Sequence, residues 1–380
     1  MASFATAEGT RRYAARFDGR PSASLRASAA TGHFREQPAA AGLVMSSLGI
    51  GTYLGNLDAG TDQAYTDAVV AAVSGGINVI DSAINYRFQR SERSIGAALK
   101  QLAALGYARD ELLLCTKGGY LTPDGEMPAD PSDYFFREYI EKGIFRAQDI
   151  AAGCHCMTPR YLEDQLERSL RNLGVECIDV YYLHNPETQL GAVPREEFTR
   201  RVRAAFEVLE SVVSAGKIRF YGMATWNAFR QAENAPEAIA LGEMVTLASE
   251  VAGPSHHFRL VQLPYNLAMT EALTRSNQPV NGRCLPMIEA AHALGITLVG
   301  SASLLQGQAA RNLPGSIAEA LGLDNDVHRA LQFARSSPGI TTALVGMSRV
   351  EHVRANLKLV GVAPASAEQF AKLFERGESA

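Results

Sequence analysis

The stretch IDVYYLH, residues 178–184, is an almost continuous apolar run that ends in a histidine. Runs of this kind are typical of strands that are covered on both faces, as in a parallel sheet flanked by helices. A second run, LLLCTK at residues 112–117, has the same character and ends in a lysine. These two segments therefore predict buried parallel strands whose carboxyl ends carry polar side chains.

Similar runs recur along the chain, and amphipathic helical patterns lie between them, such as the leucine stripe of residues 161–173. Eight strands that alternate with helices predict a parallel sheet closed into a (β/α)8 TIM barrel. The competing open doubly wound sheet needs a glycine-rich first turn, but LGIGTYLG (48–55) has different glycine spacing. The predicted strands are residues 47–51, 77–81, 112–117, 178–184, 218–223, 260–263, 296–300 and 341–346.

The barrel is expected to form a single domain over residues 32–362, opened by a β-hairpin at 33–48. Residues 1–31 are expected to be an N-terminal extension, either a surface arm or a partly ordered segment, and residues 363–380 a C-terminal tail. Long connections that follow barrel strands lie on the catalytic face and are usually functional. The predicted loop insertions are residues 118–158, 227–259 and 264–283.

Bulk composition excludes several classes of protein. Net charge is −4, which gives no basic footprint for nucleic acid, and no apolar stretch approaches the length of a membrane span. The five scattered cysteines favour reduced thiols over a disulfide framework. We therefore expect a cytoplasmic protein that binds neither nucleic acid nor a membrane.

Polar residues stand where the predicted strands end. Asp81, Lys117 and His184 close three successive strands, and Tyr86 follows Asp81 by five residues. A buried ammonium needs a partner, and Asp81 on the neighbouring strand is the obvious one for Lys117. The four side chains are therefore predicted to form one cluster at the barrel mouth.

Such a cluster is suited to proton transfer. A tyrosine has an unperturbed pKa of about 10, and a close ammonium is expected to lower it towards the neutral range. A neighbouring imidazole can donate a hydrogen bond to a carbonyl oxygen. The alternative of a Schiff-base lysine at Lys117 is disfavoured, because pairing with Asp81 keeps that lysine protonated.

The segment GCHCM, residues 153–157, offers at most three metal ligands, and no second cluster is visible. No metal site is predicted, and Cys154, His155 and Cys156 are expected to be buried or to line the substrate loop.

From about His33 to Lys358 the chain resembles the aldo-keto reductases. GINVIDSAINYRFQRSERSIGAAL is similar to the family signature, and LLLCTKGG and IDVYYLHNPE to the segments that carry its lysine and histidine. GKIRFYGMATW, LVQLPYN and ALVGMSRVEHVRANL match later landmarks in the same order. The resemblance implies NADPH-dependent reduction of an aldehyde or ketone, or the reverse oxidation of an alcohol. It makes Tyr86 the general acid, tuned by Lys117 and Asp81, with His184 directing the carbonyl.

The same resemblance implies the residues that bind the cofactor. Ser348 and Arg349 would hold the 2′-phosphate, Asn356 would meet the adenine, and Gln262 would hold the carboxamide. Gly51 and Thr52 would lie by the nicotinamide ribose. The full predicted set is Gly51, Thr52, Asp81, Thr225, Gln262, Ser301, Leu304, Gly346, Ser348, Arg349, His352 and Asn356.

Three features depart from the family pattern near the nicotinamide, the first of them a pair of residues. The usual Ser-Asn pair is Ala224-Thr225, the usual stacking aromatic is Ser301, and the proline after it is Ser303. Trp226, the single tryptophan, is a candidate replacement for the lost ring. An active oxidoreductase is the main hypothesis, and a non-catalytic cofactor-sensing or regulatory barrel subunit is the alternative.

Overall fold

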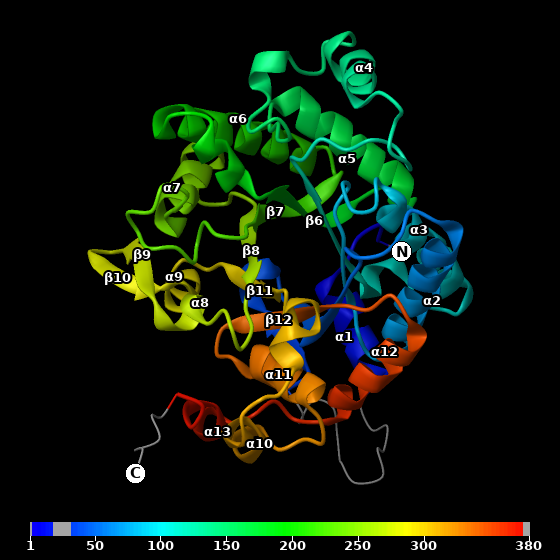
Figure 1. The fold of residues 1–380 in the computed structure, drawn as a ribbon, viewed down its shortest axis with the longest axis vertical. Coiled ribbons are helices and arrows are strands. Elements are labelled where there is room, and N and C mark those ends of the chain that lie inside the picture. Colours follow the sequence, from blue (N-terminus) through cyan, green and yellow to red (C-terminus); the bar gives the residue numbers. More distant parts are fainter. Residues whose placement is uncertain (1, 18–31, 375–380) are drawn as a thin grey trace.

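The computed structural model describes residues 2–17 and 32–374. Eight parallel strands close into a barrel with helices around it, which confirms the predicted TIM barrel (Figure 1). All eight strands lie at the predicted places, with ends that differ by three residues or fewer. In barrel order they are β3 (Leu48–Gly51), β4 (Val79–Asp81), β5 (Leu113–Gly118), β6 (Ile178–His184), β7 (Ile218–Ala224), β8 (Phe258–Pro264), β11 (Thr297–Ser301) and β12 (Ile340–Gly346).

Every residue of β5 and β6 is buried, which explains their unbroken apolar character. Two glycines allow close approach between neighbouring strands. A Cβ on Gly222 would stand 1.9 Å from the carbonyl oxygen of Leu260, and one on Gly49 would stand 2.6 Å from a methyl of Leu344. The register pairs Gly51 with both Asp81 and Gly346, so three strand ends of interest are level with one another.

The helices pack their apolar stripes against the barrel, and in α5 the stripe Leu162, Leu166 and Leu170 is buried as predicted. The main helices are α2 (Ala59–Gly75), α3 (Arg90–Ala104), α5 (Pro159–Leu173), α6 (Arg195–Ser214), α7 (Leu241–Ala252), α9 (Met287–Ala293), α10 (Gly315–Leu321), α11 (Asp326–Ser336) and α12 (Val350–Asn356). Short segments of 3-10 or π helix are η2 (Pro38–Ala40), η3 (Arg109–Glu111), η4 (Phe136–Ile140), η5 (Ala147–Asp149), η6 (Pro186–Gly191), η7 (Leu305–Ala310) and η8 (Leu357–Gly361).

The amino-terminal residues pack against the amino end of the barrel, so residues 2–17 are not the predicted surface arm. They form α1 (Ala7–Ala15), which lies beside the predicted hairpin of β1 (Phe34–Gln37) and β2 (Leu43–Ser46). The Ala5 amide donates to Asp179 Oδ1 at 2.6 Å, and the buried Tyr13 hydroxyl donates to the Val73 carbonyl at 2.6 Å. Residues 18–31 of the predicted extension lie outside the described residues.

All three predicted loop insertions contain regular structure, although to different extents. Residues 227–259 include α7, whose Leu241, Met244 and Leu247 are buried at helical spacing. Residues 264–283 include α8 (Glu271–Thr274) and β9 (Ser276–Val280), which pairs with β10 (Arg283–Pro286). The 118–158 connection is mostly irregular, with α4 (Pro131–Phe135) projecting at the top of Figure 1. In the C-terminal tail, α13 (Ala367–Ala371) stacks Phe370 on Phe333, with centroids 5.3 Å apart.

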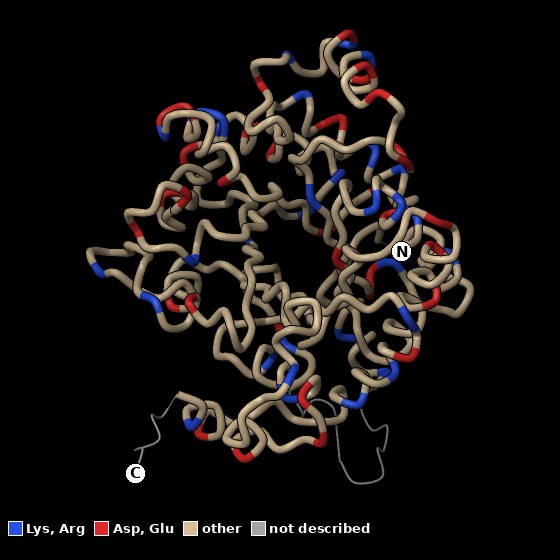
Figure 2. Tube along the Cα trace, viewed as in Figure 1, with Lys and Arg blue, Asp and Glu red and all other residues tan. Residues whose placement is uncertain are grey.

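Lysine and arginine are interspersed with aspartate and glutamate around the outer elements (Figure 2). This mixture agrees with the small net charge of −4. Within residues 2–17 and 32–374, no helix combines the length and the apolar character that crossing a membrane requires.

Candidate active site

Four predicted residues meet at the carboxyl ends of β4, β5 and β6. Lys117 Nζ lies 2.6 Å from Asp81 Oδ2 and 5.0 Å from the centroid of the Tyr86 ring. The ring centroids of Tyr86 and His184 are 5.7 Å apart, in an edge-to-face arrangement. The side chains therefore form the cluster that the sequence predicts.

The ion pair at its centre is almost completely buried, with 1% of the Lys117 side chain and 6% of the Asp81 side chain exposed. Lys117 Nζ also donates to the Ser82 carbonyl at 2.6 Å, and Gln262 Nε2 donates to Asp81 Oδ1 at 2.8 Å. Burial lowers the pKa of Lys117, but Asp81 and Tyr86 outweigh it and the net shift is upward. Burial raises the pKa of Asp81 against the opposing effects of Lys117 and Gln262. Because each carboxyl oxygen of Asp81 accepts a hydrogen bond, we assign Asp81 as a carboxylate and Lys117 as an ammonium.

The pKa of Tyr86 is shifted in the opposite direction to the one predicted. Burial raises it above the usual value, and this effect exceeds the lowering by the Lys117 ammonium. The sequence indicated that Lys117 lies near Tyr86, but it did not indicate how deeply the Tyr86 hydroxyl is buried. Tyr86 therefore holds its proton throughout the neutral range, the state that a proton donor needs.

His184 is neutral at neutral pH. Burial, Lys117 and His155 together hold the pKa of this imidazole well below its usual range. Its Nδ1 is buried and makes no hydrogen bond to any described residue. The Tyr120 ring, with its centroid 5.1 Å from that of His184, packs edge-to-face against the imidazole.

The turn that carries Tyr86 is fixed on both sides. Arg87, Phe88 and Gln89 all have positive φ, so the chain coils tightly before α3 begins. The Ile84 amide donates to the Lys117 carbonyl at 3.2 Å, and Arg87 Nη2 donates to Asp62 Oδ1 at 2.6 Å. The turn is therefore tied to β5 on one side and to α2 on the other.

The predicted cofactor residues lie on the remaining strand ends. Gly51 and Gly346 are register partners on β3 and β12, and Ser301 ends β11 beside them. Thr52 is buried, and its hydroxyl donates to the Asp81 carbonyl at 3.3 Å. Thr225 follows β7, and its amide donates to the Gln262 carbonyl at 2.9 Å. Gln262 also binds Asp81, a second role that the sequence did not suggest.

The other predicted cofactor residues surround α12, apart from the partly buried Leu304 after β11. Ser348 is partly exposed, while Arg349 and His352 are exposed. Arg349 occupies the N-cap position of α12 and has no ion-pair partner in the described part of the chain. Asn356 is buried, and its Nδ2 contacts Met347 Sδ at 3.3 Å.

The structure also brings His155 to the site, which the sequence predicted only as buried or lining the substrate loop. His155 is fully buried, and its Nε2 lies 2.7 Å from the His184 carbonyl oxygen. No group of metal-ligating side chains that could hold an ion occurs in the two described ranges. A contact between residues 29 positions apart leaves no trace in local sequence pattern.

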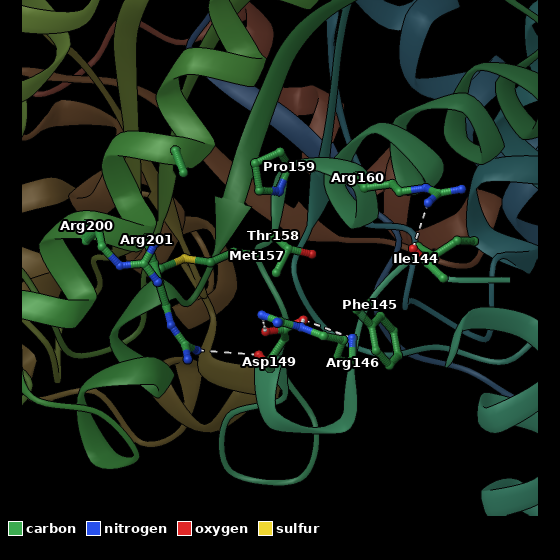
Figure 3. A pocket seen from close by; sticks show the side chains of 12 residues that line it. Ile144, Phe145, Arg146, Asp149, Met157, Thr158, Pro159, Arg160, Arg200 and Arg201 are labelled. Carbon is green, nitrogen blue, oxygen red and sulfur yellow. Dashed lines mark hydrogen bonds and ion pairs between the residues drawn. The ribbon is translucent and has the colours of Figure 1, made fainter. Parts of the chain in front are cut away.

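A separate pocket of about 420 Å³ lies between residues 143–149 and the beginnings of α5 and α6 (Figure 3). None of the four clustered residues lines it. Four arginines line this pocket: Arg146, Arg160, Arg200 and Arg201. Arg146 forms an ion pair with Asp149, and Arg200 and Arg201 both form ion pairs with Glu197.

Two buried histidines predict loss of stability in mild acid. Burial lowers the pKa of His155 to about 4 and that of His33 to about 3, whereas an unfolded histidine titrates near about 6.5. Their stabilising effect is complete above the unfolded pKa and declines below it, because the unfolded chain then binds more protons. The expected slope is ~1 kcal/mol per pH unit for each histidine.

Thermal denaturation at about pH 7.5 and about pH 5 measures this effect. The double variant His33→Gln/His155→Gln should lose less stability than the wild type between these two conditions. Equal losses in both proteins would show that other groups control acid stability.

Comparison with known proteins places this geometry in context. The model of the Aldo/keto reductase family matches residues 47–376. The chain is 29% identical to aldo-keto reductase YhdN of Bacillus subtilis over 189 residues, 49% of this chain and 45% of that protein. It is 27% identical over 194 residues to the NADH-specific methylglyoxal reductase of Escherichia coli, 49% of this chain and 50% of that one. The chain thus spans about half the length of these curated relatives.

A solved aldo-keto reductase of Klebsiella pneumoniae in complex with NADPH shares the fold. Its TM-score is 0.59 at 19% identity, over 90% of this chain and 94% of that one. Because the family model covers the barrel from its first strand to α13, the protein belongs to the aldo/keto reductase family.

Proposed function

We propose that this protein transfers hydride between NADPH and a carbonyl or alcohol substrate, with Tyr86 as the general acid and base. The observation that supports the proposal most strongly is the buried Lys117 ammonium, held by Asp81 at 2.6 Å and placed 5.0 Å from the Tyr86 ring centroid. A fixed cation beside a phenol stabilises the negative charge that develops when the phenol gives up its proton.

The residues divide the proposed reaction between them. NADPH, when bound, supplies the hydride. Tyr86 gives its proton to the carbonyl oxygen as the alcohol forms, and Lys117 stabilises the resulting phenolate. His184 is neutral, so it can donate a hydrogen bond that orients the carbonyl without protonating it. In the oxidative direction the same groups act in reverse.

The strand ends offer groups that suit a dinucleotide. Thr225 Oγ1 and Ser303 Oγ are buried with no hydrogen-bond partner among the described residues, so a bound polar group would satisfy them. Arg349 stands exposed after β12, the eighth barrel strand, where phosphate sites are common in TIM barrels. We propose that Ser348 and Arg349 hold the 2′-phosphate, and that the other predicted cofactor residues contact the rest of NADPH.

Trp226 is the proposed replacement for the ring that is absent at Ser301. It follows Thr225 directly and is 43% exposed. Its amide donates to Glu187 Oε1 at 2.7 Å, so its backbone is held although its indole is exposed. An exposed indole at the barrel mouth provides a flat apolar surface for stacking.

A substrate screen tests the proposal. NADPH oxidation would be followed with a panel that includes benzaldehyde, methylglyoxal and an aldose. Turnover with at least one carbonyl is expected. Tight NADPH binding without turnover of any carbonyl or alcohol would instead support the regulatory subunit.

Arg349 is expected to set the preference for NADPH. In Arg349→Ala, NADPH affinity should fall by about 10-fold to 100-fold, because a charge-assisted hydrogen bond to phosphate is lost. NADH affinity should barely change. Fluorescence titration with both nucleotides measures this, and Arg354→Ala, an exposed arginine on the same helix, is the matched control. If both affinities fall equally, the phosphate assignment is wrong.

A further inference from the structure

The 118–158 connection is closed at its base by a short antiparallel pairing. The Cys156 amide donates to the Gly119 carbonyl at 2.8 Å, and the Leu121 amide donates to the Cys154 carbonyl at 2.8 Å. These bonds make residues 122–153 a closed lobe. His155 lies in the pairing itself, opposite Tyr120.

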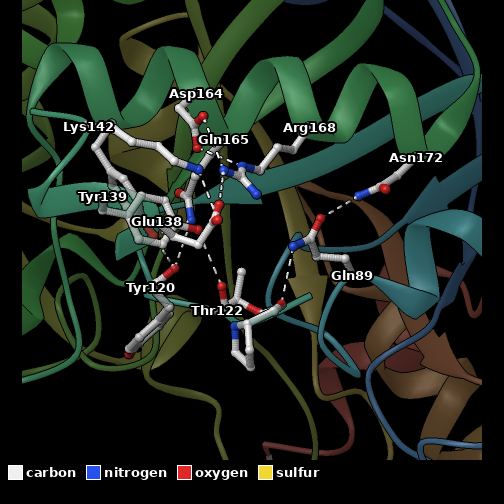
Figure 4. A network of polar contacts seen from close by, with 12 residues as sticks. Gln89, Tyr120, Thr122, Glu138, Tyr139, Lys142, Asp164, Gln165, Arg168 and Asn172 are labelled. Atoms are coloured by element: carbon white, nitrogen blue, oxygen red, sulfur yellow. Dashed lines mark hydrogen bonds and ion pairs between the residues drawn. The ribbon is translucent and has the colours of Figure 1, made fainter. Parts of the chain in front are cut away.

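The lobe has its own core and its own attachment to α5. Buried Tyr139 and Phe145 of the lobe pack with Cys156 of the closing pairing and with Tyr161 of α5. Gln165 Oε1 accepts from the Gly119 amide at 2.7 Å. Gln165 Nε2 donates to the Tyr120 carbonyl at 2.8 Å (Figure 4). The base of the lobe is therefore rigidly held where it meets the barrel.

The His155 ring links the base of the lobe to the catalytic cluster through hydrogen bonds. Its Nε2 lies 2.7 Å from the His184 carbonyl oxygen, and its Nδ1 lies 2.8 Å from Gln189 Nε2. A carbonyl can only accept, so Nε2 carries the hydrogen and Nδ1 accepts from Gln189. Gln189 Oε1 in turn accepts from Arg201 Nη1 at 2.6 Å. Both ring nitrogens of His155 and both side-chain polar atoms of Gln189 therefore have a hydrogen-bond partner of the right kind.

The hydrogen bond from His155 is made to the His184 carbonyl, at the end of β6. His184 is the last residue of β6, and Asn185 turns the chain away with φ of 45°. Tyr120 fills the space between the two imidazoles, with centroids 5.2 Å from that of His155 and 5.1 Å from that of His184. A Cβ on Gly119 would stand 2.6 Å from His155 Nε2, so the fit requires glycine at that position.

We propose that His155 is a positioning residue, which fixes the backbone of His184 and thereby aims its imidazole at the substrate carbonyl. The inference rests on the proposed function, because it concerns the alignment of that reaction. Through His155 the fold of the lobe controls the geometry of the catalytic cluster, although the lobe supplies no group to the chemistry.

The test compares two buried histidines. His155→Ala removes the bond to His184, and His33→Ala is the matched control. His33 is equally buried and makes two hydrogen bonds, to Ser47 Oγ and the Gly76 carbonyl, beside the amino-terminal hairpin. His155→Gln keeps a donor and an acceptor on one side chain and should rescue function. Gln189→Leu tests the same chain of residues if His155→Ala does not fold.

The expected result is a fall in kcat of about 10-fold to 100-fold in His155→Ala, as for a misaligned catalytic group. NADPH affinity should stay the same, kcat of His155→Gln should stay within about 3-fold of the wild type, and Gln189→Leu should show a smaller fall in kcat. His33→Ala should lose thermal stability but keep its kcat per folded molecule.

Wild-type kcat in His155→Ala, or in Gln189→Leu if that alone folds, would overturn the proposal. An equal fall in His33→Ala would also overturn it, because the loss would then follow general destabilisation. Tyr86→Phe, measured in parallel, separates failure of the proposed function from failure of the positioning role of His155. If Tyr86→Phe retains full turnover the proposed function fails, whereas if Tyr86→Phe is inactive and His155→Ala keeps the wild-type kcat, the positioning role alone fails.

Discussion

Replacing Tyr86 with phenylalanine is expected to reduce kcat by about 1,000-fold, within the range that general acid catalysis supplies. The change removes one hydroxyl and keeps the ring that packs against His184 and under Lys117. NADPH affinity and thermal stability should therefore change little. Steady-state turnover, cofactor titration and thermal denaturation of the same preparation would separate these quantities.

Tyr53→Phe is the matched control for that experiment. Tyr53 lies next to Tyr86, with ring centroids 5.0 Å apart, but it is 57% exposed. It should keep turnover within about 3-fold of the wild type, since it donates no proton to the reaction. Equal turnover in Tyr86→Phe and the wild type would remove Tyr86 from the mechanism.

Breaking the buried ion pair should damage both activity and stability. Lys117→Met leaves the Asp81 carboxylate buried without its cation, and Asp81→Asn leaves the ammonium without its anion. Each single variant is expected to lose ~3–5 kcal/mol of unfolding free energy, the usual cost of an uncompensated buried charge. Turnover should fall in both variants. Lys117→Met removes the cation beside Tyr86, and Asp81→Asn removes the carboxylate that holds Lys117 in place.

The double variant Asp81→Asn/Lys117→Met separates the two effects. It contains no unpaired charge, so urea denaturation should show it to be more stable than either single variant, while its turnover stays as low. Lys217→Met is the surface control: Lys217 and its partner Glu167 are each 42% exposed, and such pairs contribute under ~1 kcal/mol. Turnover that recovers with stability in the double variant would show that the pair is only structural.

The barrel strands could be predicted because each is a buried apolar run, and the polar residues at their ends are conspicuous for that reason. Asp81, Lys117 and His184 follow from this pattern, and closure of the barrel then brings them together. The same reasoning cannot give the pKa of Tyr86, because the depth of a side chain depends on elements that pack over it. Sequence reasoning therefore predicted that Lys117 lowers the pKa of Tyr86, but it missed the larger increase that burial causes.

Long-range contacts account for the other differences. Ala5 meets Asp179 across 174 positions, and this contact turns an apparently featureless extension into part of the fold. His155 meets His184 through the closure of a lobe whose path no local periodicity reveals. Helix α7 was missed because a weakly amphipathic segment lies within a long, turn-rich connection, where only packing against the barrel reveals it.

The most direct measurement is isotope transfer from NADPH that carries deuterium at its transferable position. With a carbonyl substrate found in the screen, the wild-type protein should place deuterium on the carbinol carbon of the product, and Tyr86→Phe should yield almost none in the same time. Product without deuterium, or equal labelling by both proteins, would contradict hydride transfer assisted by a phenol beside a buried cation.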